Sequence, residues 1–484
     1  MITTLAFRHL LVRKVRSLFL LLGFSIGVGV MIVLLSVGEA MLNQSRDVSL
    51  VGGGELTVLP QGIDIEAMRT GGLGGMFFTI ERARFLTRQA LGGERHDDLV
   101  RTVAPAIEGK LLYLCPAASR CVPTAVRAGG EIPSRAAALG AGLDVLEGRW
   151  RDSPADSAYI APTPQQFYDE LDRFHLPKRR DSTWAEWHYF NLVVGPDEWW
   201  YVTYLIGGEV SLSERDDRWG GGMLVTHRRP DGRHDRYTAE VSSSSVVFDT
   251  ASADVTIGGS HVRQRDGEYR LHVEARGDRG LARLDLVLRP KPNRYFPPVE
   301  LREDDFLSGY VVPALAATAS GRLCAGARCI EARDIPAYHD HNWGVWRDVT
   351  WEWGAAQGER LSLLYGGVYG PEDSGSSPFF LTMVDSLGVR RVLRFGEIEY
   401  HGSRPADGLR GARAPERFTL VGTWEADTVR LSVRVGHALA SEVTASTYRR
   451  VFLQMRGSFE LSGSVLGEPV HDRGEGFFET YLTQ

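Results

Sequence analysis

Short strand patterns follow one another over residues 160–484, and they constrain the fold of this chain more than any other feature. At residues 198–205, successive side chains alternate between two faces, as they do on a β-strand. The turn sequences Pro230-Asp231-Gly232 and Arg265-Asp266-Gly267 lie beside further strand patterns and are typical of hairpins. One helical pattern, at residues 164–174, interrupts the strands. An open antiparallel sheet leaves unpaired edges and a closed one does not, so the sequence predicts antiparallel barrels.

The length of this β region predicts two barrels. One eight-stranded barrel needs fewer residues than the region provides. We therefore predict a mainly β fold of two antiparallel barrels, the first over residues 160–325 and the second over residues 326–484. All eleven tryptophans lie at or beyond Trp150, which indicates that a different unit, a small mixed α/β segment over residues 39–155, precedes the barrels.

The composition is that of a globular protein and gives no reason to expect a nucleic-acid partner. Of the 484 residues, 43% are hydrophobic and 24% are charged, and the formal net charge is −6. Lys and Arg are scattered along the chain, whereas a protein that binds nucleic acid presents a basic patch.

Residues 17–38 form a stretch of 22 residues without a charged side chain, which is long enough to cross a bilayer as a helix. Four basic residues precede it: Arg8, Arg13, Lys14 and Arg16. The positive flank of a span stays in the cytoplasm. The sequence thus predicts a cytoplasmic basic segment over residues 1–16, one transmembrane helix over 17–38, and a periplasmic remainder, anchored in the inner membrane of a bacterium.

The cysteines fit an exported location. They form two closely spaced pairs, Cys115 with Cys121 and Cys324 with Cys329. Each pair can close a short loop as a disulfide in an oxidising compartment, whereas a zinc site would need tighter Cys-x-x-Cys spacing. Strand patterns at residues 111–114 and 122–126 flank the first pair and predict a hairpin that it closes.

The run His339-Asp340-His341-Asn342-Trp343-Gly344 gathers acid, base and ring side chains on one strand pattern. Such a strand is typical of a pocket wall. Successive strand residues face opposite sides, so Asp340 and Asn342 point away from His339 and His341. Two interpretations follow, with opposite faces turned inward. Either Asp340 acts as an acid in a pocket, or His339 and His341 hold a metal ion together with His188.

Two segments resemble the carotenoid hydratase (hydroxyneurosporene synthase) and AttH-like superfamily. The residues that carry this resemblance are Glu186-Trp187-His188-Tyr189-Phe190-Asn191 and Tyr338-His339-Asp340-His341-Asn342-Trp343-Gly344. The resemblance covers roughly residues 160–484 and implies two fused lipocalin-like barrels and, in some members, acid-catalysed addition of water to a polyene double bond. His188 stands where the superfamily usually has a second tryptophan.

Hydratase chemistry would assign roles to several of these residues, without a cofactor. Asp340 would donate the proton, because a carboxyl group kept from water retains it. His341 would accept the proton of the water that adds, and Glu186 would hold that water or orient the histidine. Glu479, in the last strand pattern, either faces the cavity or is solvated, and we expect it to be solvated. The side chains expected to contact a hydrophobic, isoprenoid-type ligand are Trp187, Tyr189, His339, Asn342, Trp343, Trp351, Trp353 and Tyr365.

The first 150 residues or so resemble the start of a MacB/LolE-type ABC transporter permease. The matching pieces are residues 6–16, the uncharged span and residues 143–149. This resemblance implies ABC transporter subunits as partners. It leaves open a second function, in which the barrels bind a lipid or another apolar cargo beside an exporter without catalysis. A third possibility is a structural relic of a fusion with neither role. In that case Asp340 and Asn342 only secure a strand end through backbone hydrogen bonds.

Overall fold

The computed structural model describes residues 14–46, 83–87, 100–114, 124–139, 151–213, 217–303, 306–370, 379–444 and 449–483. The chain divides into two compact units. Residues 1–78 and 100–153 form the smaller unit, and residues 79–99 and 154–484 form the larger one.

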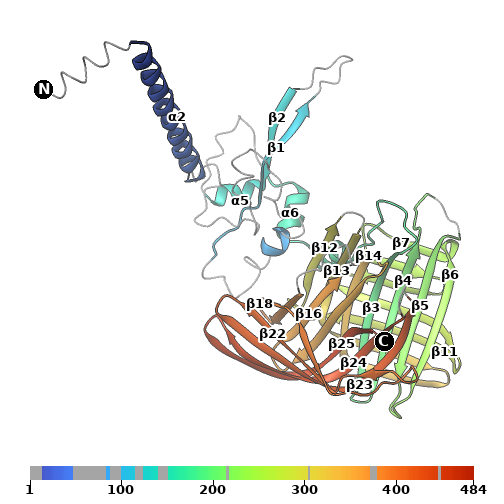
Figure 1. Ribbon diagram of the computed structural model, residues 1–484. Helices are drawn as coiled ribbons and strands as arrows, with labels where there is room; N and C mark the ends of the chain where they lie inside the picture. The colour runs from blue at the N-terminus through green and yellow to red at the C-terminus, as the bar shows by residue number, and fades with distance from the viewer. Residues whose placement is uncertain are drawn as a thin grey trace. The chain divides into compact units, whose positions relative to one another are not determined.

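The smaller unit contains a long helix and a hairpin (Figure 1). Helix α2 spans Lys14–Arg46. Strand β1 (Ala106–Leu114) pairs antiparallel with β2 (Thr124–Glu131), which confirms the predicted hairpin, and the short helix α5 (Pro133–Ala138) follows. Cys115 and Cys121 lie outside the described residues. Within the described part of the chain, no helix combines the length and the apolar character that a membrane crossing requires.

The larger unit begins with two helices, α6 (Pro154–Ile160) and α7 (Pro164–Asp172). The side chain of Thr163 accepts a hydrogen bond from the backbone N–H of Gln166, and the Gln166 side chain accepts one from the backbone N–H of Thr163. This capping box fixes the start of α7. The helix ends at Asp172, whose side chain is fully buried.

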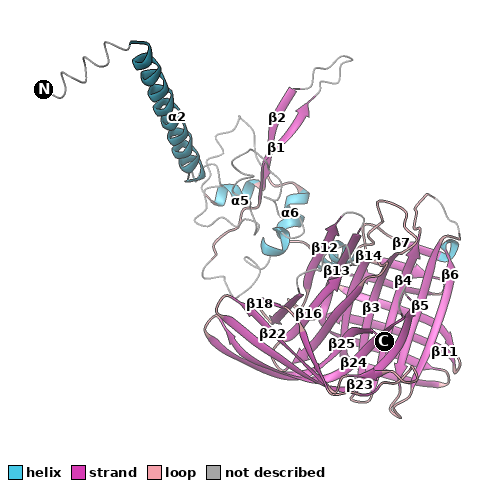
Figure 2. Ribbon diagram, viewed as in Figure 1, coloured by secondary structure: helices cyan, strands magenta, loops and turns pink. Residues whose placement is uncertain are grey.

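The first barrel closes antiparallel strands into a ring (Figure 2). Four short strands are added to this ring: β7 (Val246–Phe248), β8 (Asp254–Ile257) and β9 (Ser260–Arg265) continue from β10, and β12 (Phe296–Glu303) pairs with β13. In order around the ring, the strands are β11 (Gly280–Pro290), β13 (Phe306–Ala325), β14 (Arg328–Val345), β3 (Trp184–Gly195), β4 (Glu198–Gly208), β5 (Trp219–Arg228), β6 (His234–Ser242) and β10 (Glu268–Gly277), which pairs with β11 again.

The sequence pattern explains how these strands form. In β10, Tyr269, Leu271 and Val273 are buried, and the residues between them are more exposed. The preceding turn, Asp266-Gly267, has φ values of 53° and 84°. A two-residue hairpin turn of type I′ requires positive φ at both positions, and glycine and aspartate accept it more readily than other residues.

The second barrel repeats the architecture of the first. It has two small additions: β19 (Ile398–His401) pairs with β22, and β20 (Arg404–Pro405) pairs with β21 (Arg413–Ala414). Its ring consists of β18 (Gly388–Phe395), β17 (Phe379–Asp385), β16 (Ser362–Tyr369), β15 (Thr350–Gly358), β25 (Glu468–Thr483), β24 (Arg449–Val465), β23 (Asp427–Thr444) and β22 (Arg417–Trp424), which pairs back with β18. The predicted mainly β fold of two closed antiparallel barrels is confirmed.

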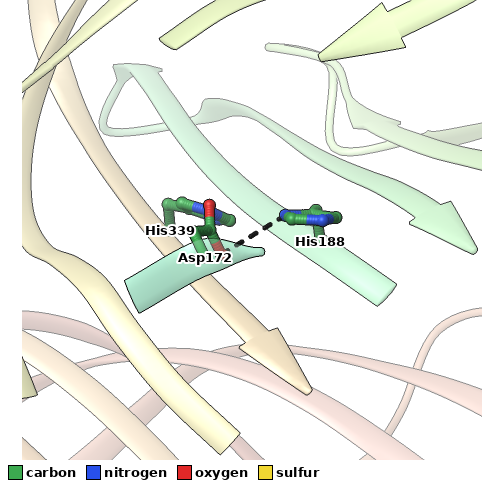
Figure 3. Close-up of side chains that lie close together, drawn as sticks. All are labelled: Asp172, His188 and His339. Carbon is green, nitrogen blue, oxygen red and sulfur yellow. Dashed lines mark hydrogen bonds and ion pairs between the residues drawn. The ribbon is translucent and has the colours of Figure 1, made fainter. Parts of the chain in front are cut away.

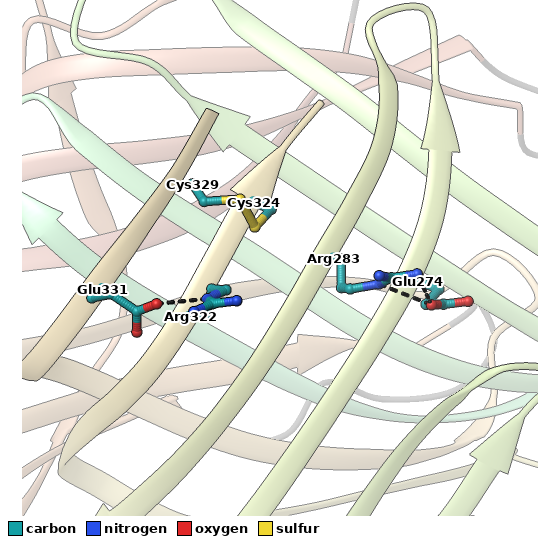
Figure 4. Close-up of a disulfide and its surroundings, with 6 residues drawn as sticks. All are labelled: Glu274, Arg283, Arg322, Cys324, Cys329 and Glu331. Carbon is teal, nitrogen blue, oxygen red and sulfur yellow. Dashed lines mark hydrogen bonds and ion pairs between the residues drawn. A yellow bond between two sulfur atoms is a disulfide. The ribbon is translucent and has the colours of Figure 1, made fainter. Parts of the chain in front are cut away.

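The border between the barrels lies further along the chain than the prediction of 325/326. Strand β14 pairs with β13 on one side and β3 on the other, so the first barrel extends to Val345. The predicted border falls in the β13–β14 turn, where turn residues suggest a boundary although the two strands form one hairpin. Cys324 and Cys329 face each other across this hairpin and form a disulfide (Figure 4), as predicted.

Each barrel is filled by its own apolar core, and a third cluster joins the two barrels. Residues of both barrels contribute to this seam, among them Tyr310 and Tyr338 from the first and Trp353, Leu364 and Phe380 from the second. The seam buries large rings from both sides, and burial of such rings is a major favourable term in packing. The pocket described next lies at this seam.

Candidate functional site

A pocket of about 140 Å³ lies between the two barrels. Half of its lining residues are aromatic, and two carboxyl groups are part of the wall. Ligand sites commonly combine an apolar wall with a few polar groups in this way. The lining residues are Trp187, Tyr189, Thr203, Ser308, Tyr310, Asp340, Asn342, Trp346, Trp351, Trp353, Val368, Phe452, Gln454 and Glu479.

Asp340 is the first of the two carboxyl groups, and β14 turns it toward the pocket. Its side chain is 2% exposed. Oδ2 accepts a hydrogen bond from the Tyr338 hydroxyl at 2.8 Å, and Oδ1 accepts one from the Asn342 amide at 2.7 Å. Burial raises the pKa of the Asp340 carboxyl to about 8, against these two hydrogen bonds, and the neighbouring Glu479 carboxyl adds to the rise. An acid in such surroundings is protonated at neutral pH.

Glu479, on β25, is the second carboxyl group, so the expectation that it is solvated is wrong. It accepts hydrogen bonds from the Trp351 indole N–H at 3.0 Å and from the Gln454 amide at 3.3 Å. Burial raises the pKa of Glu479, although these hydrogen bonds act in the opposite direction. The strand pattern alone could not show this, because the barrel against which β25 packs is far away in sequence.

Three indoles form one side of the pocket wall. The ring of Trp187 lies 4.6 Å from that of Trp346 and 6.1 Å from that of Trp351, measured between centroids. Trp346 and Trp351 meet edge to face at 5.6 Å. The faces of such rings attract positive charge, most strongly where water is excluded. Trp346 was not predicted, although it follows the signature run closely.

The histidines of the signature run lie on the opposite face of β14, inside the first barrel. His339 Nε2 lies 2.8 Å from Asp172 Oδ2, and His341 Nδ1 lies 2.8 Å from Asp172 Oδ1. His188, on β3, is placed with its Nδ1 3.5 Å from Asp172 Oδ1. Figure 3 shows Asp172 with His339 and His188 around it. All four side chains are 2% exposed or less.

His341 also contacts Glu186. Its Nε2 lies 2.7 Å from Glu186 Oε1, and the same carboxylate accepts hydrogen bonds from the backbone N–H of His175 at 2.7 and 3.0 Å. Burial alone would lower the pKa of His341, but the Asp172 and Glu186 carboxylates outweigh it and raise this pKa to about 9. His341 is therefore held between two carboxylates, away from the pocket.

The structure brings together Trp187, Tyr189, Asn342, Trp351 and Trp353 with Asp340 in the pocket. Five other predicted site residues do not line it. Glu186, His339 and His341 face the interior of the first barrel. The Trp343 indole stacks on His175 at 3.6 Å and donates to Glu300, and Tyr365 packs in the core of the second barrel. These placements follow from alternation along the strands.

Asp172 and His175 were missed by the sequence analysis. Asp172 is the last residue of α7, and His175 follows it closely. Asp172 and His339 are 167 residues apart along the chain. A buried carboxylate at the end of a short helix looks like an ordinary solvated helix residue in a sequence. The signal that could have found it is the concentration of histidines on one face of β14, which requires a counter-charge.

Among known proteins, similarity to this chain was found only in solved structures. No protein-family model and no curated protein matches the chain. Among solved structures, a protein assigned as AttH (NE1406) from Nitrosomonas europaea is 17% identical, with a TM-score of 0.42 and coverage of 64% of this chain and 96% of that one. Kievitone hydratase from Nectria haematococca is 14% identical, with a TM-score of 0.43 and coverage of 63% and 91%. CghA, solved with Sch210972, is 10% identical, with a TM-score of 0.42 and coverage of 66% and 98%.

Proposed function

We propose that the pocket between the barrels binds an unsaturated apolar molecule and that Asp340 protonates one of its double bonds. The observation that carries this proposal is a carboxyl group inside a pocket in which half of the lining residues are aromatic. The pocket is smaller than the roughly 300–1,000 Å³ of typical drug-sized sites, so it would take a small alkene or one end of a longer isoprenoid chain.

The reaction follows from the surroundings of Asp340. The π electrons of the double bond form a C–H bond with the acid proton, and a carbocation develops at the neighbouring carbon. The Tyr338 hydroxyl and the Asn342 amide already donate to the two oxygens of Asp340, so they stabilise the carboxylate that the transfer leaves behind. The indoles of Trp187 and Trp351 are placed to stabilise the cation.

Glu479 replaces His341 as the base in this scheme, because His341 faces the interior of the first barrel. Water adds to the carbocation and gives its proton to the Glu479 carboxylate, which yields an alcohol. If the carbocation instead loses a different proton to Asp340, the product is an isomer of the starting alkene. Hydration and isomerisation therefore share the first step.

Transfer of isotope from water to carbon tests the proposal. The full chain is incubated in D₂O with a short acyclic isoprenoid alkene, and mass spectrometry measures deuterium bound to carbon. We expect incorporation with the unmodified chain and a loss of roughly 100- to 10,000-fold in Asp340→Asn, with alkene binding retained. The control is Glu331→Gln, a carboxyl change on the same strand but outside the pocket. Equal incorporation in Asp340→Asn and in the unmodified chain would end the proposal.

A second candidate function is binding without catalysis, of a lipid or apolar cargo passed to an ABC exporter. The ring-lined pocket favours it, because such a wall retains apolar molecules whether or not a proton moves. Retention of the alkene by the unmodified chain, with no deuterium incorporation, would favour this candidate. Co-purification of the chain with transporter subunits would support the partner.

We propose further that the barrels lie outside the cytoplasm and that residues 17–38 anchor them in the inner membrane. The Cys324–Cys329 disulfide supports this location, since such bonds persist in oxidising compartments. Protease added to spheroplasts is expected to digest the barrels. Digestion only after lysis would contradict the location.

A further inference from the structure

The cluster around Asp172 has polar atoms that its own hydrogen bonds do not satisfy. Among the described residues, neither ring nitrogen of His188 has a hydrogen-bond partner, and the same holds for Asp172 Oδ1 and His341 Nδ1. Asp172 Oδ1 and His341 Nδ1 lie only 2.8 Å apart, yet they are not aligned as donor and acceptor. Buried polar atoms without partners cost free energy, so the cluster is incomplete as it stands.

The tautomer of His339 also indicates that the cluster needs a cation. Its Nδ1 lies 3.0 Å from the backbone carbonyl oxygen of Tyr189, an acceptor, so Nδ1 carries the proton. A neutral His339 then turns the lone pair of Nε2 toward the carboxylate oxygen of Asp172, 2.8 Å away. Two lone pairs at that separation repel unless a cation lies between them. The cation is either a second proton on His339 or a metal ion.

The arrangement matches a metal site in three respects. The ligand atoms of Asp172, His188 and His339 lie within 4.8 Å of one another. The individual distances to Asp172 are 2.8 to 3.5 Å, close to the roughly 3.3 Å that separates ligands around a tetrahedral zinc ion with bonds near 2.1 Å. The hydrogen bond from His339 Nδ1 to a backbone carbonyl is the usual second contact that orients a metal-bound histidine.

We propose that Asp172, His188 and His339 bind a divalent transition-metal ion. One carboxylate and two imidazoles are a donor set that suits Zn²⁺, and Co²⁺ can occupy the same geometry. The ligands come from the end of α7, from β3 and from β14, so the ion would join the helix to the barrel wall.

A neighbouring group, His175, Glu186 and His341, is a weaker candidate. Its ligand atoms are equally close. However, the Glu186 carboxylate already accepts the backbone N–H of His175 and contacts both imidazoles, so its oxygens are satisfied. A satisfied carboxylate has little to gain from a metal ion. The Asp172 group differs because Asp172 Oδ1 and both ring nitrogens of His188 still lack hydrogen-bond partners among the described residues.

The proposed ion is structural in character and independent of the pocket chemistry. All three donors are buried protein side chains, so a substrate in the pocket does not reach the ion. The pocket side chains Asp340 and Asn342 lie on the other face of β14. The ion would therefore fix the position of the strand without contacting the ligand.

Metal content and cobalt spectroscopy of the purified full chain test the proposal. The chain is stripped with a chelator, dialysed against Zn²⁺ or Co²⁺, and analysed by elemental mass spectrometry and visible absorption. We expect one ion per chain and the intense absorption of tetrahedral Co²⁺. His188→Gln and Asp172→Asn should weaken binding by roughly a hundredfold or more. The control is His272→Gln, a partly exposed histidine beside Asp285 elsewhere on the first barrel.

The variants also separate the metal from a protonated histidine. His188 has no hydrogen-bond partner to lose, so His188→Gln is expected to fold, which circular dichroism checks. Loss of the ion in His188→Gln, with retention in His272→Gln, supports the site. Equal metal content in these two variants, or no bound ion in the unmodified chain after dialysis, would overturn it and leave a second proton on His339 as the cation.

Discussion

Buried carboxyl groups lie on both sides of β14, but in opposite electrostatic surroundings. On the pocket face, Asp340 has only uncharged donors, the Tyr338 hydroxyl and the Asn342 amide. On the interior face, Asp172 and Glu186 meet the imidazoles of His339 and His341 at 2.7 to 2.8 Å. Burial opposes ionisation on both faces, but only the interior face offers a compensating positive charge. One strand thus separates an acid that keeps its proton from carboxylates that give it up.

The largest effect on stability is expected on the interior face. Asp172→Asn removes the carboxylate that His339, His341 and His188 share, and it leaves buried imidazoles without their counter-charge. Breaking a buried ion pair by removing one partner costs about 3–5 kcal/mol. Urea denaturation would measure the loss. A loss below about 1 kcal/mol would mean that the interior face, like the pocket face, has no carboxylate held by a compensating positive charge.

A smaller effect is expected from Glu352 in the second barrel, a buried carboxyl that tests the comparison elsewhere. The Tyr400 and Thr480 hydroxyls each donate to it at 2.7 Å. Burial raises the pKa of Glu352 from 4.5 to about 7, against these hydrogen bonds. As the pH rises from about 4.5 to 7, the unfolded chain loses a proton that the folded chain keeps. The free energy of unfolding should therefore fall by about 3 kcal/mol over this range.

Glu352→Gln provides the control for this pH dependence. Glutamine does not titrate, so the difference in unfolding free energy between the unmodified chain and the variant isolates the contribution of Glu352. We expect the unmodified chain to lose stability relative to Glu352→Gln as the pH rises. A constant difference from pH 4.5 to 8 would show that Glu352 ionises as freely as in water.

The donors to Asp340 are expected to affect turnover by about one order of magnitude. Tyr338→Phe removes the hydrogen bond to Oδ2 that stabilises the carboxylate formed by proton transfer. One such bond contributes about 1 kcal/mol, so deuterium incorporation should fall roughly three- to tenfold. Asn342→Ala removes the donor to Oδ1 and serves as the matched variant. Faster turnover in either variant would indicate that these donors hold the acid in an unproductive state.

The smallest effect is expected for the stability of Asp340→Asn. An amide is not penalised by burial as a carboxylate is, and it can still pair with Tyr338 and Asn342. The free energy of unfolding should therefore change by less than about 1 kcal/mol, similar to Glu331→Gln, whose exposed ion pair with Arg322 contributes little. If Asp340→Asn lost as much stability as Asp172→Asn, the two faces of β14 would not differ in how their carboxyl groups contribute to stability.

Much of the fold, and one face of the site, could be predicted from the sequence. Alternating strand patterns and hairpin turns predicted closed barrels because closure is the general solution for long antiparallel sheets. Alternation on β14 placed Asp340 and Asn342 opposite His339 and His341. The positions of Glu479 and Asp172 could not be predicted, because they depend on how β25 and α7 pack against elements distant in sequence. Tyr365 was assigned to the pocket as one of the aromatic rings available to stabilise a carbocation, but its side chain packs in the core of the second barrel.

The most direct test of the account measures deuterium incorporation and zinc content on the same preparations of Asp340→Asn and His188→Gln. We predict that Asp340→Asn loses deuterium incorporation and keeps zinc, whereas His188→Gln loses zinc and keeps measurable incorporation. If Asp340→Asn instead transfers deuterium to carbon as fast as the unmodified chain, Asp340 is not the acid and the proposed reaction is contradicted.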